Sequence, residues 1–175
     1  MLILTRADVT ALLDLKDCIE AVEQAFIQHA KGELPTAPGI LGAHVAGGGF
    51  HIKTAALGKY FAAKVNANYP DNPRLRSLPT VQGVITLFDL PSGKPLAVLD
   101  SIEITIQRTA AASAVAARAL ARSDAHTVTV YGCGVQGKAT CVHSFSFGRL
   151  PTPMQSISIR HGPTRSLKNS APNWT

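Results

Sequence analysis

The sequence lacks a long apolar run, a signal-like beginning and paired cysteines. No stretch approaches the roughly 18 uncharged apolar residues of a membrane-spanning helix, so we expect no membrane span. The apolar run at the start, Leu2–Leu4, is too short for the core of a signal peptide. The three cysteines are scattered, and the six histidines show no metal-ligand spacing. These features predict a reduced, cytoplasmic protein without a metal site.

Acidic residues are missing from the whole segment after Asp124, and this absence explains most of the net charge of +6. Up to Val142 the chain has 13 Lys and Arg against 11 Asp and Glu. Residues 143–175 add four basic residues and no acid. A basic excess confined to one end, without interleaved aromatic residues, is not the pattern of a nucleic-acid-binding groove. We therefore expect no nucleic-acid partner.

Hydrophobic residues make up 46% of the chain, which is enough to bury the core of one average domain or two small ones. Thr5 and Asp8 form a helix-start pattern, and Gly32 ends a second apolar stripe. Helices are predicted from Thr5, over residues 17–31 and 101–122, and from the glycine loop to about residue 147. Strands are predicted at residues 50–55, 61–66, 81–89, 95–100 and 127–131, with a hairpin turn at residues 90–94. The alternation predicts an α/β protein with a mainly antiparallel sheet and flanking helices.

A glycine loop directly follows the valine-rich strand predicted at residues 127–131. Gly132, Gly134 and Gly137 have the G-x-G-x-x-G spacing that lets backbone approach a pyrophosphate at a helix N-terminus. The alternative is a plain turn, but the strand before the loop and the helix after it favour dinucleotide binding. The loop's Cys133 is interpreted as a small filler. The acid expected about twenty residues later is absent, so the sequence does not separate NAD from NADP.

Three basic residues have two interpretations each. Lys64 and Lys53 lie in predicted strands, where a lysine either binds a carboxylate or transfers a proton, or is simply exposed. Arg108 faces small residues in the alanine-rich helix, where it either grips a carboxylate or phosphate or is solvated. Spacing alone favours the exposed alternative in all three cases. Ser113 has no partner pattern for a nucleophile.

Several motifs together resemble the ornithine cyclodeaminase/μ-crystallin family. The alanine-rich helix reads RTAAASAVAA from Arg108, and the glycine loop reads GCGVQG from Gly132. Three further motifs follow in the family's order: GGGFHIK from Gly47, KVNANYP from Lys64 and LPTVQG from Leu78. The resemblance covers Met1 to about Val142.

The resemblance implies an NAD- or NADP-dependent enzyme that acts on a small amino or imino acid. Members of the family are amino-acid dehydrogenases, ketimine reductases or cyclodeaminases that release ammonia. Their fold pairs a substrate domain, whose sheet closes into a barrel across a homodimer, with a Rossmann domain. We accordingly expect residues 1–122 to form the substrate-binding and dimerisation domain, and residues 123–147 to begin a Rossmann domain.

The resemblance also implies roles for individual residues. Lys64 would be the active-site lysine, and Arg108 would bind the substrate carboxylate and lie near the cofactor. The other expected cofactor-binding residues are Thr80, Thr109, Gly132, Gly134, Val135, Gln136 and Gly137. Gly39 stands where many members have a second carboxylate-binding arginine. His51 and Lys53 replace an acid and a methionine of the cyclodeaminases, which disfavours ornithine as the substrate.

The segment after Val142 departs from the family, which continues through the Rossmann sheet and a catalytic aspartate. Residues 148–175 are expected to be a poorly ordered tail. One hypothesis is a shift of reading frame, because Thr164–Thr175 read in another frame permits the helical peptide Ala-Phe-Ser-Glu-Lys-Leu-Gly-Ala-Glu-Leu-Asp. The alternative is a genuine unrelated tail. Either way we expect weak or absent turnover, and a non-catalytic dimerising fragment is the alternative function.

Overall fold

The computed structural model describes residues 1–125, 127–132, 134–145, 156–161 and 165–166. The chain divides into two compact units. The first consists of Met1–Leu13 and Gln24–Thr105, and the second of Asp14–Glu23 and Ile106–Thr175. Two helices contribute residues to both units: α2 (Leu15–Lys31) and α4 (Ile102–Leu120).

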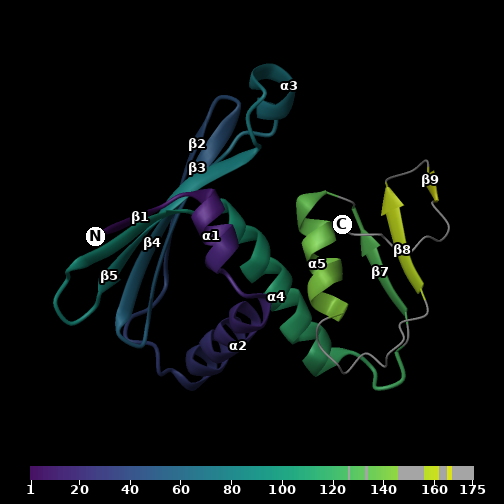
Figure 1. Ribbon diagram of the computed structural model, residues 1–175, viewed down its shortest axis with the longest axis horizontal. Coiled ribbons are helices and arrows are strands. Elements are labelled where there is room, and N and C mark those ends of the chain that lie inside the picture. Colours follow the sequence, from purple (N-terminus) through teal and green to yellow (C-terminus); the bar gives the residue numbers. More distant parts are fainter. Residues whose placement is uncertain (126, 133, 146–155, 162–164, 167–175) are drawn as a thin grey trace. The chain divides into compact units, whose positions relative to one another are not determined.

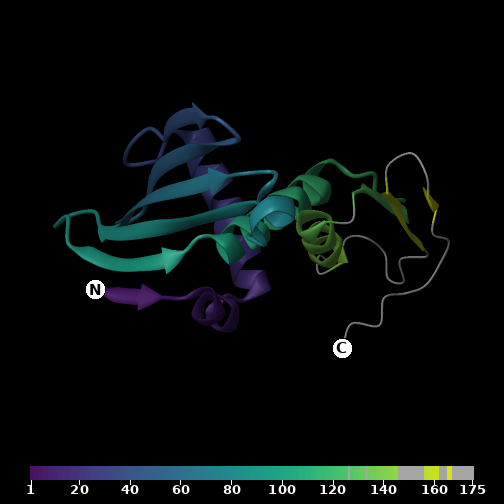
Figure 2. The same cartoon turned by 90° about the horizontal axis from the view of Figure 1, so that it is seen from above.

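The first unit is built on a six-stranded sheet with the order β1-β6-β5-β4-β3-β2. All pairs are antiparallel except β1 with β6, which is parallel (Figures 1 and 2). The strands are β1 (Leu2–Leu4), β2 (Gly39–Val45), β3 (Gly48–Leu57), β4 (Tyr60–Asn68), β5 (Val81–Asp89) and β6 (Pro95–Asp100). The predicted α/β class with a mainly antiparallel sheet is therefore confirmed.

The predicted strands agree with β5 and β6 at both ends, whereas β3 and β4 extend beyond their predicted bounds. The strands β1 and β2 have no counterpart among the predicted ones. β1 has only three residues, and β2 is almost entirely exposed, so neither carries the apolar alternation of a half-buried strand. Both exist because a neighbouring strand provides hydrogen-bond partners.

The helix α1 (Arg6–Leu12) begins where it was predicted, and α2 begins two residues before its predicted start and ends at the predicted Lys31. Thr5 caps α1: its hydroxyl accepts from the Asp8 N–H at 3.3 Å, and Asp8 Oδ2 accepts from the Thr5 N–H at 2.8 Å. The Thr5 hydroxyl donates to Asp8 Oδ2 at 2.7 Å, and this hydrogen bond, followed by the one from the Thr5 N–H, lowers the pKa of the Asp8 carboxyl. Gly32 ends α2 with a φ of +71°, a conformation that glycine adopts easily. The short helix α3 (Asn72–Arg76) has no counterpart among the predicted helices.

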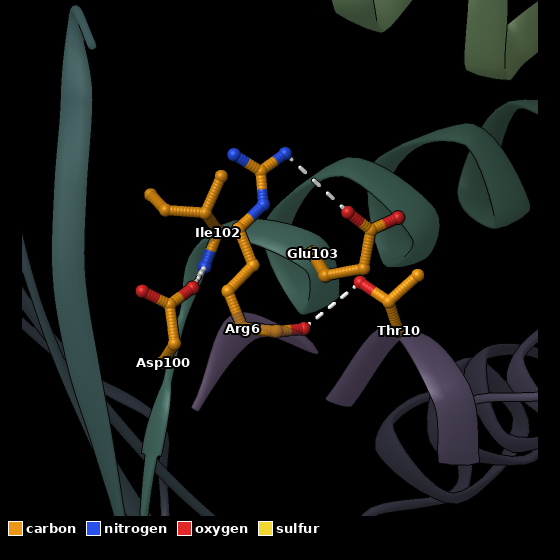
Figure 3. Close-up of polar contacts among 5 residues, drawn as sticks. All are labelled: Arg6, Thr10, Asp100, Ile102 and Glu103. Carbon is orange, nitrogen blue, oxygen red and sulfur yellow. Dashed lines mark hydrogen bonds and ion pairs between the residues drawn. The ribbon is translucent and has the colours of Figure 1, made fainter. Parts of the chain in front are cut away.

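The helix α4 begins directly after β6, and three polar contacts define this junction (Figure 3). The Ile102 N–H donates to Asp100 Oδ1 at 2.8 Å, which satisfies one of the helix's unpaired N–H groups. Glu103, in the first turn, lies 3.5 Å from the Arg6 guanidinium of α1. The Thr10 hydroxyl donates to the Arg6 carbonyl at 2.8 Å. The N-terminal helix is thus tied to the start of α4.

The second unit contains a strand–helix–strand arrangement around the glycine loop. Its elements are β7 (Thr127–Tyr131), α5 (Val135–Phe145), β8 (Ser156–His161) and β9 (Arg165–Ser166). β7 pairs with β8 in parallel, and β8 pairs with β9 in antiparallel fashion. An ion pair between Glu23 and Arg118 connects α2 to α4 within this unit.

β8 corrects one expectation. The sequence was expected to supply only the first Rossmann strand and a helix, yet β8 pairs in parallel with β7 over five residues. Ser-Ile-Ser-Ile alternates with the period of two that strands require, and this pattern was overlooked. The rest of residues 148–175, apart from 156–161 and 165–166, lies outside the described residues, as does the end of the helix predicted to reach residue 147. Within the described part of the chain, no helix is long and apolar enough to cross a membrane.

Candidate functional site

Lys64 lies in the middle of β4 and is half-buried. Its Nζ lies 3.4 Å from Thr105 Oγ1, in the first turns of α4. The lysine therefore does not simply extend into solvent, which was one of the two interpretations of the sequence. The structure places its ammonium group over the sheet face on which α4 begins.

Asn66, two residues further along β4, shares the face of Lys64 and is 8% exposed. Its Oδ1 accepts from the fully buried Ser101 hydroxyl at 2.6 Å, and its Nδ2 donates to Thr105 Oγ1 at 3.4 Å. No motif in the sequence singled out Asn66, Ser101 or Thr105. The period of two between Lys64 and Asn66 was the only signal for the asparagine.

Gly83 of β5 pairs directly with Asn66 and makes room for its side chain. A Cβ atom at position 83 would overlap the Val65 carbonyl oxygen and Asn66 Oδ1, and would lie 2.8 Å from Asn66 Cα. The Gly83 carbonyl also accepts from the Ser101 N–H at 3.0 Å. Glycine is therefore required here because two strands and the start of α4 converge on one point.

The sheet register places three other residues relative to Lys64. Lys53 pairs with Lys64 and His51 pairs with Asn66, so both lie on the Lys64 face. Lys53 is exposed, as spacing alone favoured, and His51 is half-buried. Gly39 pairs with Thr54 and therefore lies on the opposite face. A side chain at position 39 would not point toward the lysine.

The remaining predicted substrate and cofactor residues lie at element ends and on α4. Thr80 precedes β5 in the first unit, and its carbonyl accepts from the Tyr69 N–H at 2.8 Å. Arg108 and Thr109 lie on α4 in the second unit, where Arg108 is exposed and Thr109 is half-buried. The Ser113 hydroxyl donates to the Thr109 carbonyl at 3.2 Å, which is a structural contact within the helix.

The glycine loop has the geometry that a pyrophosphate-binding loop requires. Gly132 has a φ of +99°, which permits the tight turn after β7. A Cβ atom at Gly137 would overlap the Gly132 carbonyl oxygen, so the helix can pack on the turn only through glycine. Among the described residues, a Cβ atom at Gly134 would meet nothing within 4 Å, so this part of the structure leaves the loop open at its second glycine. These three positions fit a dinucleotide phosphate group.

The first turn of α5 presents N–H groups toward this open side of the loop. The first hydrogen bond of α5 runs from the Lys138 N–H to the Gly134 carbonyl at 3.1 Å. The N–H groups of Val135, Gln136 and Gly137 come before that bond, where an α-helix provides no carbonyl acceptor of its own. N–H groups in this position can donate to a bound anion. The Gln136 side chain donates to the Ile106 carbonyl at 3.1 Å and so joins α5 to α4. Cys133 lies outside the described residues.

His143 is a buried histidine on α5, and its side chain is 1% exposed. Its Nδ1–H donates to the Ala139 carbonyl at 2.9 Å, whereas Nε2 has no hydrogen-bond partner among the described residues. Burial lowers the pKa of His143 from its usual value of 6.5. The neutral imidazole is therefore the form that suits the folded state.

We expect the free energy of unfolding to decrease as the pH falls below 6.5. The unfolded chain then binds a proton at His143 that the folded chain binds less readily. The decrease levels off once the pH is below the folded-state pKa. Urea unfolding of the chain and of the His143→Leu variant at several pH values between 5 and 8 measures this. The dependence of the free energy of unfolding on pH would contradict the assignment to His143 if it persisted unchanged in His143→Leu but vanished in a variant of the exposed His29.

Among the described residues, no group of three or more His, Cys, Asp or Glu side chains is placed to hold a metal ion.

Comparisons with known proteins identify the family to which the chain belongs. The sequence model described as the ornithine cyclodeaminase/mu-crystallin family matches residues 1–158, beyond Val142, where the resemblance was expected to end. An alanine dehydrogenase from Archaeoglobus fulgidus is 35% identical over 135 residues, which cover 77% of this chain and 41% of that protein. The chain thus spans less than half the length of this curated relative.

Two solved structures are similar to the chain. An archaeal alanine dehydrogenase dimer with bound NAD has a TM-score of 0.79 and 32% identity, covering 83% of this chain and 45% of that one. The Thermococcus litoralis Delta(1)-pyrroline-2-carboxylate reductase in complex with NADH and L-proline has a TM-score of 0.76 and 34% identity, covering 83% and 46%. Together with the family match over most of its length, these similarities show that the chain belongs to the ornithine cyclodeaminase/mu-crystallin family.

Proposed function

We propose that this chain carries the substrate side and the phosphate-binding loop of an NAD- or NADP-dependent enzyme that acts on a small amino or imino acid. The glycine loop between β7 and α5 is the observation that carries the proposal. At Gly137 the helix packs directly against the turn, whereas the described residues leave space beside Gly134 where a pyrophosphate can approach the backbone. Family membership supports the class of substrate. The relatives include an alanine dehydrogenase and a pyrroline-2-carboxylate reductase as well as proteins named as cyclodeaminases, so dehydrogenase and ketimine reductase chemistry are among the activities that the relatives support.

In this proposal the glycine loop binds the cofactor pyrophosphate. The N–H groups of Val135, Gln136 and Gly137 donate to phosphate oxygens at the positive end of the α5 dipole. Thr80, Arg108 and Thr109 lie along the rest of the cofactor, as the family resemblance implies. When bound, the nicotinamide accepts or supplies a hydride at the substrate carbon that bears nitrogen. The choice between NAD and NADP belongs to residues outside the loop.

As the family resemblance implies, Lys64 is the active-site lysine near the substrate carboxylate, and Arg108 is a residue that binds this group. An ammonium group donates to a carboxylate as a compact point charge, whereas a guanidinium forms two parallel hydrogen bonds. The Lys64 Nζ is already held above the sheet by Thr105, so little ordering of the side chain remains when substrate binds. Lys53 lies on the same sheet face as Lys64 and adds a positive charge there, which favours an anionic substrate.

A homodimer formed through the opposite sheet face is part of the proposal. Leu41, Ile52, Val65 and Val84 stand opposite one another in a row across β2, β3, β4 and β5. Of these, Leu41 is 64% and Val84 is 45% exposed. A contiguous apolar row of this kind is typical of an interaction surface. The archaeal relative is a dimer, which favours a second copy of this chain as the partner.

The full 175-residue chain tests the proposal in one set of measurements. NADH binding is followed by its fluorescence, hydride transfer by the loss of NADH absorbance with a cyclic ketimine carboxylate, and oligomeric state by sedimentation. Saturable NADH binding supports the cofactor assignment even where turnover is weak or absent. A dimer that leaves NADH fluorescence unchanged would contradict it and support the alternative of a non-catalytic dimerising fragment.

A further inference from the structure

We propose that Thr105 is a positioning residue for Lys64, and that Asn66 and Ser101 hold its hydroxyl group in place. The inference rests on the proposed role of Lys64 in binding substrate. It names a residue that neither the sequence motifs nor the comparisons assign. All four side chains belong to the first unit, and their contacts lie within it.

The chemistry of the donors determines what the Thr105 oxygen does. A lysine ammonium and the amide nitrogen of an asparagine are both donors only, and both lie 3.4 Å from Thr105 Oγ1. A hydroxyl oxygen has two lone pairs and can accept two hydrogen bonds. It can therefore accept one from the Lys64 ammonium and one from the Asn66 amide, while its own proton is directed to another group. Thr105 therefore accepts a hydrogen bond from Lys64, as a partner of an ammonium group must, because an ammonium group can only donate.

The orientation of Asn66 is what directs its donor at Thr105. Its Oδ1 accepts the 2.6 Å hydrogen bond from Ser101, which leaves Nδ2 on the Thr105 side. Rotating the amide by half a turn would exchange Oδ1 and Nδ2, and Oδ1 could then no longer accept the hydrogen bond from the Ser101 hydroxyl. The Ser101 backbone is itself fixed, since its N–H donates to Gly83 and its carbonyl accepts from the Thr105 N–H at 2.8 Å.

The arrangement connects a buried, rigid contact to a half-buried functional group. Ser101 is fully buried and Asn66 is 8% exposed, whereas Lys64 is half-buried. Lysine has four rotatable side-chain bonds. If its ammonium group is not held in place, ordering the side chain on substrate binding costs conformational entropy and lowers the affinity for substrate. Thr105 restricts Lys64 to one region of the sheet face, away from Lys53 directly opposite it.

Chemical labelling of Lys64 in the full chain tests the inference without any ligand. Trace acetylation at a series of pH values, followed by peptide mass spectrometry, gives the reactivity of Lys64 relative to the exposed Lys94. Thr105→Val keeps the shape and removes the acceptor. We expect the Lys64 to Lys94 ratio to rise about threefold or more, because the ammonium loses a partner and the side chain gains freedom. Thr105→Ser restores the oxygen and is expected to return the ratio to that of the parent.

Thr86→Val is the matched control. The Thr86 hydroxyl donates to the Ala63 carbonyl at 3.3 Å in the same sheet. Thr86 pairs with Ala63, the neighbour of Lys64 in β4, so the Thr86 side chain lies on the sheet face opposite that of Lys64. This variant removes a comparable hydrogen bond and is expected to leave the labelling ratio unchanged. Ser101→Ala, which releases Asn66, is expected to change the ratio in the same direction as Thr105→Val by a smaller factor.

The outcomes separate this inference from the proposed function. An unchanged ratio in folded Thr105→Val, or equal changes in Thr105→Val and Thr86→Val, would overturn the positioning role and leave the proposed function untouched. A specific change in Thr105→Val together with no binding of ketimine or amino-acid carboxylates would support the positioning of Lys64 but contradict its proposed substrate.

Discussion

Replacing Gly83 by alanine is expected to lower the free energy of unfolding by about 3 kcal/mol. The added methyl group would overlap the Val65 carbonyl oxygen and Asn66 Oδ1, and would lie 2.8 Å from Asn66 Cα. Backbone atoms of a central strand cannot move aside without disturbing β4 and β5 together. The same shift would lengthen the hydrogen bond from Ser101 to Asn66. Urea unfolding followed by far-UV circular dichroism measures the change.

Gly42→Ala is the control for the Gly83 variant. Gly42 also lies in a strand, β2, but a Cβ there would meet its nearest atom, the Phe50 carbonyl oxygen, at an ordinary 3.8 Å. The substitution is expected to change stability by less than about 0.5 kcal/mol or to stabilise the chain slightly, since alanine loses less backbone entropy than glycine. Equal effects of the two substitutions would mean that Gly83 is not required by close packing.

The second large effect is expected from the glycine loop, where two single substitutions separate stability from cofactor binding. Gly137→Ala places a methyl group against the Gly132 carbonyl and is expected to displace α5 from the turn. It should cost about 2 kcal/mol of stability and raise the Kd for NADH at least about tenfold. Gly134→Ala adds its methyl to open space and should leave stability unchanged.

Gly134→Ala is nevertheless expected to raise the Kd for NADH about tenfold, because the methyl group stands where the pyrophosphate approaches the backbone. Fluorescence titration with NADH, alongside thermal unfolding of each variant without ligand, gives both quantities. Unchanged NADH affinity in stable Gly134→Ala would contradict binding of the pyrophosphate at this loop. Lost stability in Gly134→Ala would contradict the open geometry instead.

Local patterns in the sequence predicted the parts of this protein that depend on near neighbours along the chain. Thr5 and Asp8 are three residues apart and cap α1 as expected. β5 and β6 have their predicted bounds, because each has a run of strand-forming residues and a turn between them. The strand, three glycines and helix of the loop were also recognised, since their roles follow from spacing.

Contacts between residues far apart in the sequence, such as strand pairs and long-range hydrogen bonds, were set by the tertiary structure. Ser156–His161 has a strand period, but only its pairing with β7 makes it the second parallel strand. β1 is a strand because β6 offers it a parallel edge ninety-odd residues later. The hydrogen bond from Lys64 to Thr105 spans 41 residues, and neither residue type nor spacing indicates such a contact.

The type of element at most positions, the glycine loop and the family could therefore be predicted from residue patterns. Which side chains meet depends on the folded chain: Lys64 lies against Thr105, Asn66 is fixed by Ser101, and Gly83 leaves room for Asn66. The physical reason is that helix caps and loops are satisfied by residues three or four apart, whereas the pairing of strands is set by a register that brings distant residues onto one face.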